Sequence, residues 1–369
     1  MIQRFLVPAI LLAASLHIAA QENPTPDTQT QDAPPPESHH DYRYSLAIID
    51  DVTLYSNLRV PIPRLLNQLL IEPTLTYRYK PTFSFSTSLV GVADKYTHTY
   101  TQLRVKETYA GISAGDFDFM AGRRIVRWGT GYAFTAIGVL DPPRDPTNPT
   151  DRLNLNEGRD MVKADYVHGP HALTAAWSSA ALAPASANLR DTTAFRYNVL
   201  VHGFDTSLIA GDDRGGDAFG GLTFTRVLGE AWEIHGEAAW REHEAILLGG
   251  KYTTPSGITF IGEFFSPPNI PYYRDVTLFP LTGRHNYAFL RAGKTRLREL
   301  PGWKQWDLAA SAVVNLNDRS YTAILDATRR FGNYFSSYIH MEIPAGSKKS
   351  EYGATPYSAA TSIGLRFQL

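Results

Sequence analysis

Few residue patterns in this sequence could support catalysis. Gly111 to Gly115 matches the Gly-X-Ser-X-Gly pattern, which exposes a serine nucleophile on a turn between a strand and a helix. The next residues, Asp116 to Phe119, alternate as a strand does, so a hairpin turn explains the small residues better. The Glu242-His243-Glu244 cluster lacks the two histidines one helical turn apart that a zinc protease uses. We therefore expect no enzyme activity and no cofactor.

Two groups of residues contain possible metal ligands. Asp141, Asp145 and Asp151 could bind calcium through carboxylate and carbonyl oxygens, but their spacing matches no EF-hand loop, and the prolines among them favour a rigid loop. His39 and His40 are possible ligands as well, yet they lie in a polar tract in which neighbouring histidines are usually solvated. We expect no metal site.

Charged side chains concentrate in the longest interruption of the sequence pattern, Gly129 to Arg159. This segment is rich in Gly, Pro, Asp and Arg. Its charged residues, with the one that follows, are Asp141, Arg144, Asp145, Asp151, Arg152, Glu157, Arg159 and Asp160. Such groups select ions and dipolar solutes when they line a narrow water-filled passage. Whether they do so depends on the elements that hold the segment in place.

The composition limits which kinds of secondary structure could hold this segment. The 369 residues include 35 basic and 36 acidic side chains, so no strong positive field favours nucleic acid. Only 43% of residues are hydrophobic, which argues against membrane helices, because each needs about 20 consecutive apolar residues. The 20 Tyr, 18 Phe and 6 Trp residues suit strands and interfacial girdles. Without cysteine there are no disulfides, thiolate metal sites or cysteine-linked lipids.

Alternating segments dominate the chain from Tyr44 onward. The clearest begins at Trp232, where Trp232, Ile234, Gly236, Ala238 and Trp240 alternate with Glu233, His235, Glu237, Ala239 and Arg241. Many segments reach the length of about 9–11 residues that a tilted membrane strand needs, with aromatic residues toward their ends. About eighteen segments can be counted, within a range of 14–18. Arg64 to Ile71 is the exception and is expected to form two helical turns.

Both ends of the chain carry sequence signals that favour export and insertion into an outer membrane. Residues 1–20 have the basic, apolar and small-residue regions of a secretory signal peptide, and 21–43 form a disordered, Pro-rich periplasmic segment. Ile363, Leu365, Phe367 and Leu369 alternate with polar or small residues up to the last position. This ending resembles the C-terminal insertion signal of bacterial outer-membrane proteins, although that signal more often ends on Phe. The resemblance implies a transmembrane barrel over 44–369.

The connections between segments also fit such a barrel. Counted from a periplasmic N-terminus, tight turns at Lys80-Pro81, Ala114-Gly115, Gly169-Pro170, His202-Gly203, Leu228-Gly229, Thr254-Pro255 and Phe331-Gly332 all fall on the periplasmic side. The long connections 57–67, 129–159, 180–191, 266–284 and 343–356 fall on the extracellular side. Short inner turns and long outer loops are typical of outer-membrane barrels.

On this count 129–159 is the third extracellular loop, and the chain resembles porin-like channels in architecture. In general porins the third loop folds inward and narrows the pore, which implies a constriction here. The pore-lining residues predicted from this resemblance and from strand parity are Arg78, Arg104, Lys106, Arg123, Arg124, Arg127, Asp141, Arg144, Asp145, Asp151, Arg152, Glu157, Arg159, Lys163, Arg196, Glu233 and Glu237. Arg366, Asp307 and Asp326 share the wall. Both strand parities carry an arginine near Gly122, which predicts a β-bulge there.

The function implied is diffusion of small hydrophilic solutes across a bacterial outer membrane, with selectivity set by the charged loop. The alternative is a channel that exports or takes up an anionic saccharide, and an outer-membrane hydrolase is a third class. The same charges could instead solvate a wide lumen. The expected partners are outer-membrane lipid and lipopolysaccharide, the barrel-assembly machinery, a small polar solute and, as a homo-oligomer, further copies of the chain.

Overall fold

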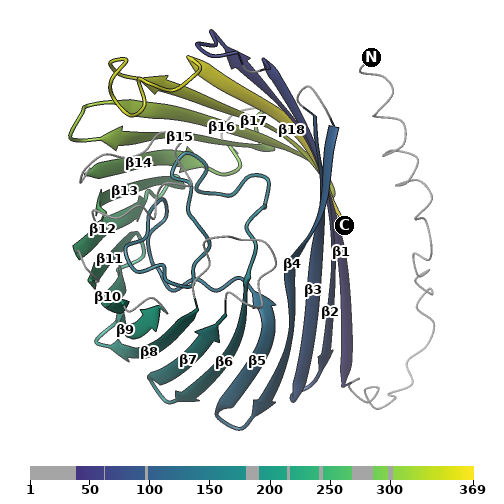
Figure 1. The fold of residues 1–369 in the computed structure, drawn as a ribbon, viewed down its shortest axis with the longest axis vertical. Coiled ribbons are helices and arrows are strands. Elements are labelled where there is room, and N and C mark those ends of the chain that lie inside the picture. Colours follow the sequence, from purple (N-terminus) through teal and green to yellow (C-terminus); the bar gives the residue numbers. More distant parts are fainter. Residues whose placement is uncertain are drawn as a thin grey trace. The chain divides into compact units, whose positions relative to one another are not determined.

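The computed structural model describes residues 39–61, 63–95, 99–179, 191–213, 217–240, 244–267, 286–297 and 302–369. They form one antiparallel sheet of 18 strands, which closes because β1 pairs with both β2 and β18 (Figure 1). The strands are β1 (His40–Ser56), β2 (Leu65–Tyr79), β3 (Phe83–Lys95), β4 (Thr99–Ala114), β5 (Phe117–Arg124), β6 (Arg159–His168), β7 (His171–Ser178), β8 (Thr192–Val201), β9 (Phe204–Asp213), β10 (Asp217–Leu228), β11 (Trp232–Trp240), β12 (Glu244–Thr253), β13 (Ile258–Ser266), β14 (Tyr287–Lys294), β15 (Trp306–Asn315), β16 (Tyr321–Phe331), β17 (Phe335–Ala345) and β18 (Ala359–Gln368). The predicted all-β, up-and-down barrel of eighteen strands is confirmed.

The C-terminal strand closes the barrel, as its alternation predicts. In β18, Phe367 pairs with Ile48 and Ile363 pairs with Val52 of β1. Leu46 and Leu369 exchange two backbone hydrogen bonds of 3.2 and 3.0 Å, so pairing continues to the last residue. Closure matters because an unpaired strand edge in hydrocarbon leaves backbone groups without partners.

Large apolar side chains cover the outward side of the strands, and inward positions are polar except where residues 125–158 pack against them. In β11, Trp232 and Trp240 point outward and are 54% and 52% exposed, whereas His235 and Glu237 point inward and are 1% and 2% exposed. A soluble sheet turns its apolar side toward a core, so this reversed arrangement suits lipid outside the barrel. Within the described ranges, no helix is long and apolar enough to cross a membrane.

Turns and loops separate onto the two ends of the barrel, as predicted. The seven predicted tight turns each join consecutive strands at one end. Gly169 (φ 57°) and Gly332 (φ 66°) adopt the left-handed backbone that such short turns require. The longest described connection, 125–158, leaves from the opposite end. The predicted loops 180–191 and 266–284 fall largely outside the described residues.

Three local expectations differ from the structure. Arg64 to Ile71 is not helical, since β2 begins at Leu65. The strand pairing of β5 is continuous on both sides, so no bulge occurs at Gly122. The register shift lies instead between β3 and β4, where Ser88 and Leu89 pair with Glu107 and Val105 and leave Lys106 as the extra residue. β1 begins at His40, four residues before the position expected for the barrel.

Candidate channel constriction

The connection between β5 and β6 folds into the barrel. The chain leaves the wall after Arg124 and returns at Arg159, and these two residues pair directly across the strands. Figure 1 shows the segment between them running inside the ring of strands. We call residues 125–158 the inner loop. The predicted inward fold of the third loop is confirmed.

Apolar side chains hold the first part of the inner loop against two regions of the wall. Ala133 and Phe134 are buried against the inward side of β12 to β16, where Phe265 stacks on Phe134 at 4.9 Å between ring centroids. Trp128 and Ile137 pack with Leu140 against β7 to β10. Burying one such side chain contributes about 1.5–3 kcal/mol. The inward-facing wall residues beneath the loop are therefore apolar, because the loop shields them from the water in the lumen.

A third apolar cluster holds the second part of the inner loop. Leu153 packs with Ile49, Leu70, Val90 and Tyr338, which lie on β1, β2, β3 and β17. The three clusters lie on different sectors of the barrel. The inner loop thus crosses the lumen and is supported at several places on its circumference.

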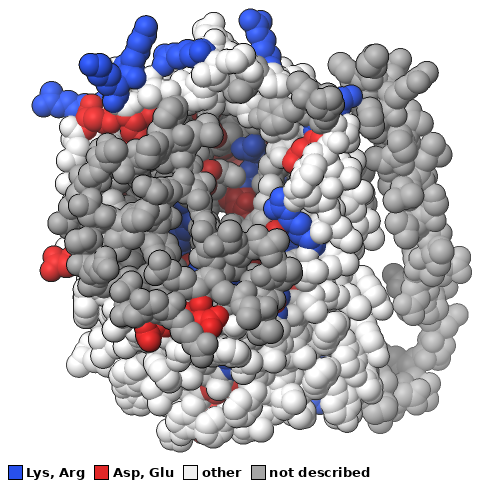
Figure 2. Space-filling view, in the orientation of Figure 1, with Lys and Arg blue, Asp and Glu red and all other residues white. Residues whose placement is uncertain are grey.

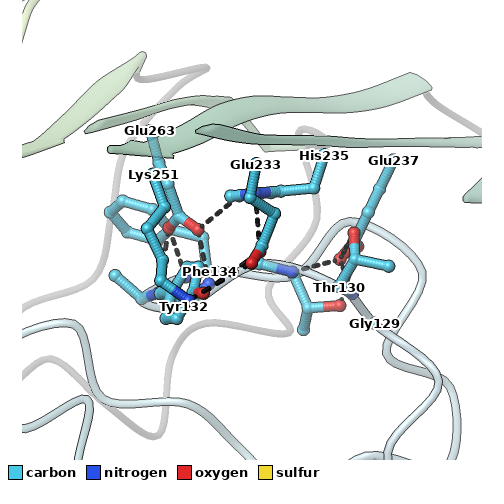
Figure 3. Close-up of polar contacts among 12 residues, drawn as sticks. Gly129, Thr130, Tyr132, Phe134, Glu233, His235, Glu237, Lys251 and Glu263 are labelled. Carbon is cyan, nitrogen blue, oxygen red and sulfur yellow. Dashed lines mark hydrogen bonds and ion pairs between the residues drawn. The ribbon is translucent and has the colours of Figure 1, made fainter. Parts of the chain in front are cut away.

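Glu237 of β11 binds the backbone of the inner loop. One carboxylate oxygen accepts hydrogen bonds from the Thr130 and Gly131 amides at 2.5 and 2.9 Å, and the other accepts from the Ala136 and Ile137 amides at 2.6 and 3.1 Å. The Thr135 hydroxyl donates at 2.9 Å. Figure 3 shows Glu237 pointing from the strand into the loop beside Gly129 and Thr130. Such charge-assisted bonds are stronger than neutral ones.

Glu263 of β13 binds the next stretch in the same way. It accepts hydrogen bonds from the Tyr132 amide and from the Ala133 and Phe134 amides, the last two at 2.9 and 3.4 Å. His235 Nε2 lies 3.0 Å from Oε1 of Glu263, the oxygen that also accepts from the Tyr132 amide, and helps to fix the carboxylate (Figure 3). Two buried wall carboxylates therefore satisfy backbone N–H groups that a loop in this position would otherwise leave without partners.

A pair of side chains on the wall holds Tyr132. Its hydroxyl donates to Glu233 at 3.1 Å, and Lys251 of β12 contacts the other Glu233 oxygen at 3.2 Å. Burial raises the pKa of Tyr132, so its hydroxyl stays protonated and can donate. Glu233 thus binds a side chain of the loop, that of Tyr132, whereas Glu237 binds the loop's backbone amides.

Within the inner loop, Asp141 organises its own segment. It is 4% exposed and accepts hydrogen bonds from the Trp128 and Gly129 amides at 2.7 and 3.2 Å. Arg144 bonds Asp141 and also donates to the Phe134 and Gly129 carbonyls at 3.2 and 3.0 Å. Burial raises the pKa of Asp141, with the amides and Arg144 acting in the opposite direction. Asp141 and Arg144 are therefore enclosed by the loop.

Arg152 joins the inner loop to the seam where the barrel closes. Its Nε lies 3.5 Å from Asp51 of β1, which is fully buried, and its Nη2 donates to Ser362 of β18 at 3.1 Å. Tyr338 of β17 donates to Asp51 at 2.6 Å. Arg366 donates to the Arg152 carbonyl. Three strands and the loop therefore share one polar network.

The base of the inner loop is an ion-pair cluster. Arg104 of β4 contacts Glu157 at 3.3 Å, and Arg123 of β5 contacts Asp160 of β6 at 2.6 Å. Arg123 also lies 3.9 Å from Glu157. The Gly158 amide donates to the carbonyl of Lys106, the residue in the bulge. The Lys106 side chain contacts Glu72 at 2.9 Å.

The remaining predicted residues lie at separate places on the wall and loop. Lys163 contacts Asp165, Arg196 donates to Ser207, Asp151 accepts bonds from its own turn and Asp145 caps Thr147. Arg124 lies over the Tyr109 ring at 4.6 Å, while Arg78 and Arg127 are exposed. The structure therefore brings together Arg104, Glu157 and Arg123, and Arg152 with Arg366, but does not gather all the predicted charges at one point.

A second loop, 346–358, reaches the same region, which sequence reasoning missed. Tyr352 packs against the cluster that contains Phe134. Glu351 accepts hydrogen bonds from Tyr287 at 2.9 Å and Asn315 at 2.7 Å, and its amide donates to Asp318 at 2.7 Å. In the sequence, only the length of the connection between β17 and β18 indicates that this loop could reach the inner loop.

The barrel interior remains partly open. Figure 2, in the orientation of Figure 1, shows a hollow inside the ring with Lys, Arg, Asp and Glu side chains on its walls. Asp326 of β16 lies in this wall network, 3.1 Å from Arg291 and 2.7 Å from His340. A polar, charged interior beneath an apolar outer surface suits the passage of hydrophilic solutes.

An 18-stranded barrel whose lumen is narrowed by an inward loop has the architecture of outer-membrane channels. Solved structures give the particular likeness. OprD of Pseudomonas aeruginosa matches with a TM-score of 0.59 and 11% identity over 89% of this chain and 95% of that one. OccK5 (OpdH) of the same organism matches with a TM-score of 0.60 and 10% identity, over 89% and 98% of the two chains. OpdQ, also from Pseudomonas aeruginosa, matches with a TM-score of 0.59 and 9% identity, over 89% of this chain and 99% of that one.

These likenesses establish that the chain has the fold of the OprD/Occ outer-membrane channels. No family model matches the sequence, and no curated protein matches it. The comparison therefore identifies the architecture and does not identify the solute.

Proposed function

We propose that this protein is a diffusion channel for small hydrophilic solutes in a bacterial outer membrane, and that charged residues around the inner loop set its selectivity. The observation that carries the proposal is the inner loop itself. Glu237 and Glu263 hold its backbone inside a barrel whose outward side is apolar. A loop supported in this way narrows the lumen without closing the hollow seen in Figure 2.

The charges that border the passage support selectivity for polar or ionic solutes. Arg127 is exposed within the inner loop, and Arg78 is exposed on β2. Arg104 and Glu157 place both signs at the base of the loop. Narrow pores select by such charges and by width. The protein is proposed to act without catalysis, consistent with the non-enzymatic channels that share its fold.

Delivery to the membrane belongs to the same proposal. Residues 1–20 would direct export and be removed, and the polar segment that follows would precede the barrel; both lie outside the described residues up to position 38. The final strand would engage the barrel-assembly machinery. Outer-membrane lipid and lipopolysaccharide would then surround the apolar face.

Purified protein in planar bilayers and in liposomes tests the proposal. We expect single-channel ion currents and entry of small neutral and charged solutes into liposomes. Protein that is correctly folded but carries no current would contradict the channel. Block of the current by uronic-acid polymers, and not by neutral saccharides of equal size, would favour the alternative of an anionic-saccharide channel. Ester or peptide hydrolysis without ion current would favour the hydrolase.

A further inference from the structure

One arginine on β16 points away from the lumen. Ile324 is inward at 1% exposure and Leu325 is outward at 48%, so strand alternation places Arg329 on the outward side with Leu325. Arg329 pairs across the strands with Trp306 of β15, and the two side chains therefore share that side. Arg329 is itself exposed. A cation on the lipid-facing side of a barrel is unfavourable unless a polar group lies beside it.

Aromatic rings surround this arginine. The guanidinium carbon of Arg329 lies 5.7 Å from the centroid of the Trp306 ring and 4.8 Å from that of the Phe331 ring. Trp303 contacts Trp306 at 5.3 Å between ring centroids, and Trp303 and Phe331 are 44% and 43% exposed. Such aromatic belts lie at the level of the lipid headgroups. Arg329 therefore lies at a membrane surface, at the end of the barrel that carries the tight turns and that is periplasmic in the predicted orientation.

The connection that follows β14 differs from the other turns at this end. It spans 295–305, whereas the longest of the seven tight turns spans 254–257. The Leu297 amide donates to the Trp306 carbonyl at 3.1 Å, which holds this connection beside the aromatic residues. Its described residues include Arg296 and Lys304, both exposed, and no acidic side chain. The surface around Trp306 is therefore basic as well as aromatic.

The neighbouring carboxylate does not neutralise these cations. Asp307 follows Trp306 in β15 and so points inward, where it accepts a hydrogen bond from the Arg296 amide at 2.7 Å and contacts Arg330 at 2.6 Å. Among the described residues, Arg329 forms no ion pair with a carboxylate, and its contacts are with the two rings. Guanidinium groups bind phosphate oxygens through strong charge-assisted hydrogen bonds. A phosphate group at the membrane surface is therefore the complementary partner.

A second outward arginine shows what is particular to this place. Arg226 of β10 lies over the Phe204 ring at 4.5 Å and pairs with Ile234, on the side of β11 that carries Trp232. The turn beside it contains the exposed Glu230 and no basic residue. Arg226 thus has the aromatic contact without the additional cations.

We propose that the outward side of β15 and β16 at the periplasmic end, formed by Trp306, Arg329 and Phe331, binds the headgroup of an anionic glycerophospholipid. The phosphodiester accepts hydrogen bonds from Arg329, and the acyl chains lie along the apolar outer side of the strands. Several basic side chains without a facing carboxylate favour a headgroup of net negative charge over a zwitterionic one. The inference rests on the outer-membrane location in the proposed function and is independent of the solute.

Native mass spectrometry from mild detergent tests this site, with equal amounts of phosphatidylglycerol and phosphatidylcholine added. The wild type should retain more phosphatidylglycerol, and Arg329→Gln should lower the ratio of the two retained lipids about fivefold, the effect of one basic side chain at an anionic surface. Arg226→Gln is the matched control and should keep the wild-type ratio. Equal retention of both lipids by the wild type, an unchanged ratio in Arg329→Gln, or the same loss in both variants would overturn the proposal.

Photo-cross-linking in intact outer membranes tests the location of the lipid. With p-benzoylphenylalanine in place of Phe331, the captured lipid should be richer in anionic glycerophospholipid than the membrane as a whole. Phe117, 46% exposed at the same end of β5 and next to Asp116, is the control position and should capture the average composition. Capture of lipid A at Phe331, or the same lipids at both positions, would contradict the site.

Single-channel recording separates this inference from the proposed channel. Arg329→Gln should conduct like the wild type, because Arg329 lies outside the lumen, while its lipid preference is lost. A variant in which conductance changes and lipid preference does not would refute the lipid site. A wild type without current would refute the channel, and the lipid measurements would still decide this proposal.

Discussion

Replacing Glu237 by glutamine should release part of the inner loop without disturbing the wall. The two oxygens of Glu237 accept four backbone hydrogen bonds, from Thr130 and Gly131 at one oxygen and from Ala136 and Ile137 at the other. Glutamine keeps the size of the side chain but replaces one oxygen by an NH₂ group, which donates. At least two loop amides would then face a donor and lose their acceptor.

The magnitude follows from the number of bonds lost. A hydrogen bond to a charged group contributes about 1.5–3 kcal/mol, so two lost bonds weaken docking of the loop by about 3–6 kcal/mol. Each 1.4 kcal/mol is about a tenfold change in population. The released state should therefore become at least about a hundredfold more populated relative to the docked state. The wall should remain intact, because β11 pairs with β10 and β12 along its whole length.

Single-channel recording at neutral pH checks this expectation. Glu237→Gln should show transitions to a higher-conductance level and greater open-channel noise than the wild type. Glu233→Gln is the matched control, since Glu233 lies four residues before Glu237 on the same side of β11 and accepts from the Tyr132 and Lys251 side chains. If Glu237→Gln gives the same conductance and noise as the wild type, the carboxylate does not hold the loop and the reasoning fails.

Two further predictions concern the second part of the inner loop. Arg152→Met leaves the fully buried Asp51 without its cation, and removing one partner of a buried pair destabilises a protein by about 3–5 kcal/mol. We therefore expect the variant to unfold at a lower temperature than the wild type when heated in detergent. Arg127→Met, whose side chain is exposed, is the control and should unfold at the wild-type temperature. Partial desolvation raises the pKa of Asp145 even though the residue is exposed, hydrogen bonds from Thr147 act in the opposite direction, and Glu342 adds to the rise. A carboxyl whose pKa is raised in the folded state favours that state when protonated and loses this contribution as pH rises through the raised pKa. Acidification toward the ordinary carboxyl range near about pH 4 should therefore neutralise Asp145 before carboxyls of ordinary pKa and lower the preference for cations in reversal-potential measurements. Asp145→Asn should reduce that early part of the change, and an identical pH profile in the variant would refute it.

Strand parity explains why the barrel could be predicted from the sequence. Outward positions such as Trp232 and Trp240 alternate with inward positions such as His235 and Glu237. The one helix expected failed because Leu65 to Ile71 is apolar on both sides. Leu70 packs inward beneath the inner loop at 2% exposure, while Leu65 and Ile71 face outward at 45% and 37%. When one side of a strand faces outward on the apolar surface and the other packs beneath the inner loop, both sides are apolar and the alternation is lost.

Gly122 shows why a local signal could be misread. A Cβ at this position would lie 2.3 Å from the Thr108 carbonyl oxygen, and its φ is 125°. The glycine therefore allows a close approach between neighbouring backbones, whereas the bulge itself forms at Lys106 on the facing strand. Sequence indicates that the region is irregular but does not tell which strand carries the extra residue.

The supports of the inner loop could be predicted only in part. Parity places Glu237 in the lumen, but its partners are backbone amides about a hundred residues earlier in the chain, and a backbone N–H leaves no signature in sequence. Glu263 escaped notice for the same reason. Asp51 interrupts the pattern of β1, and its role becomes clear only once Arg152 lies beside it.

The central claim is that the inner loop narrows an otherwise wider channel. Deletion of residues 135–156 and measurement of single-channel conductance in planar bilayers test it most directly, with the heat-modified mobility of the barrel on gels as a check of folding. The account predicts a conductance several-fold higher than that of the full chain. A folded deletion variant with unchanged conductance would contradict it.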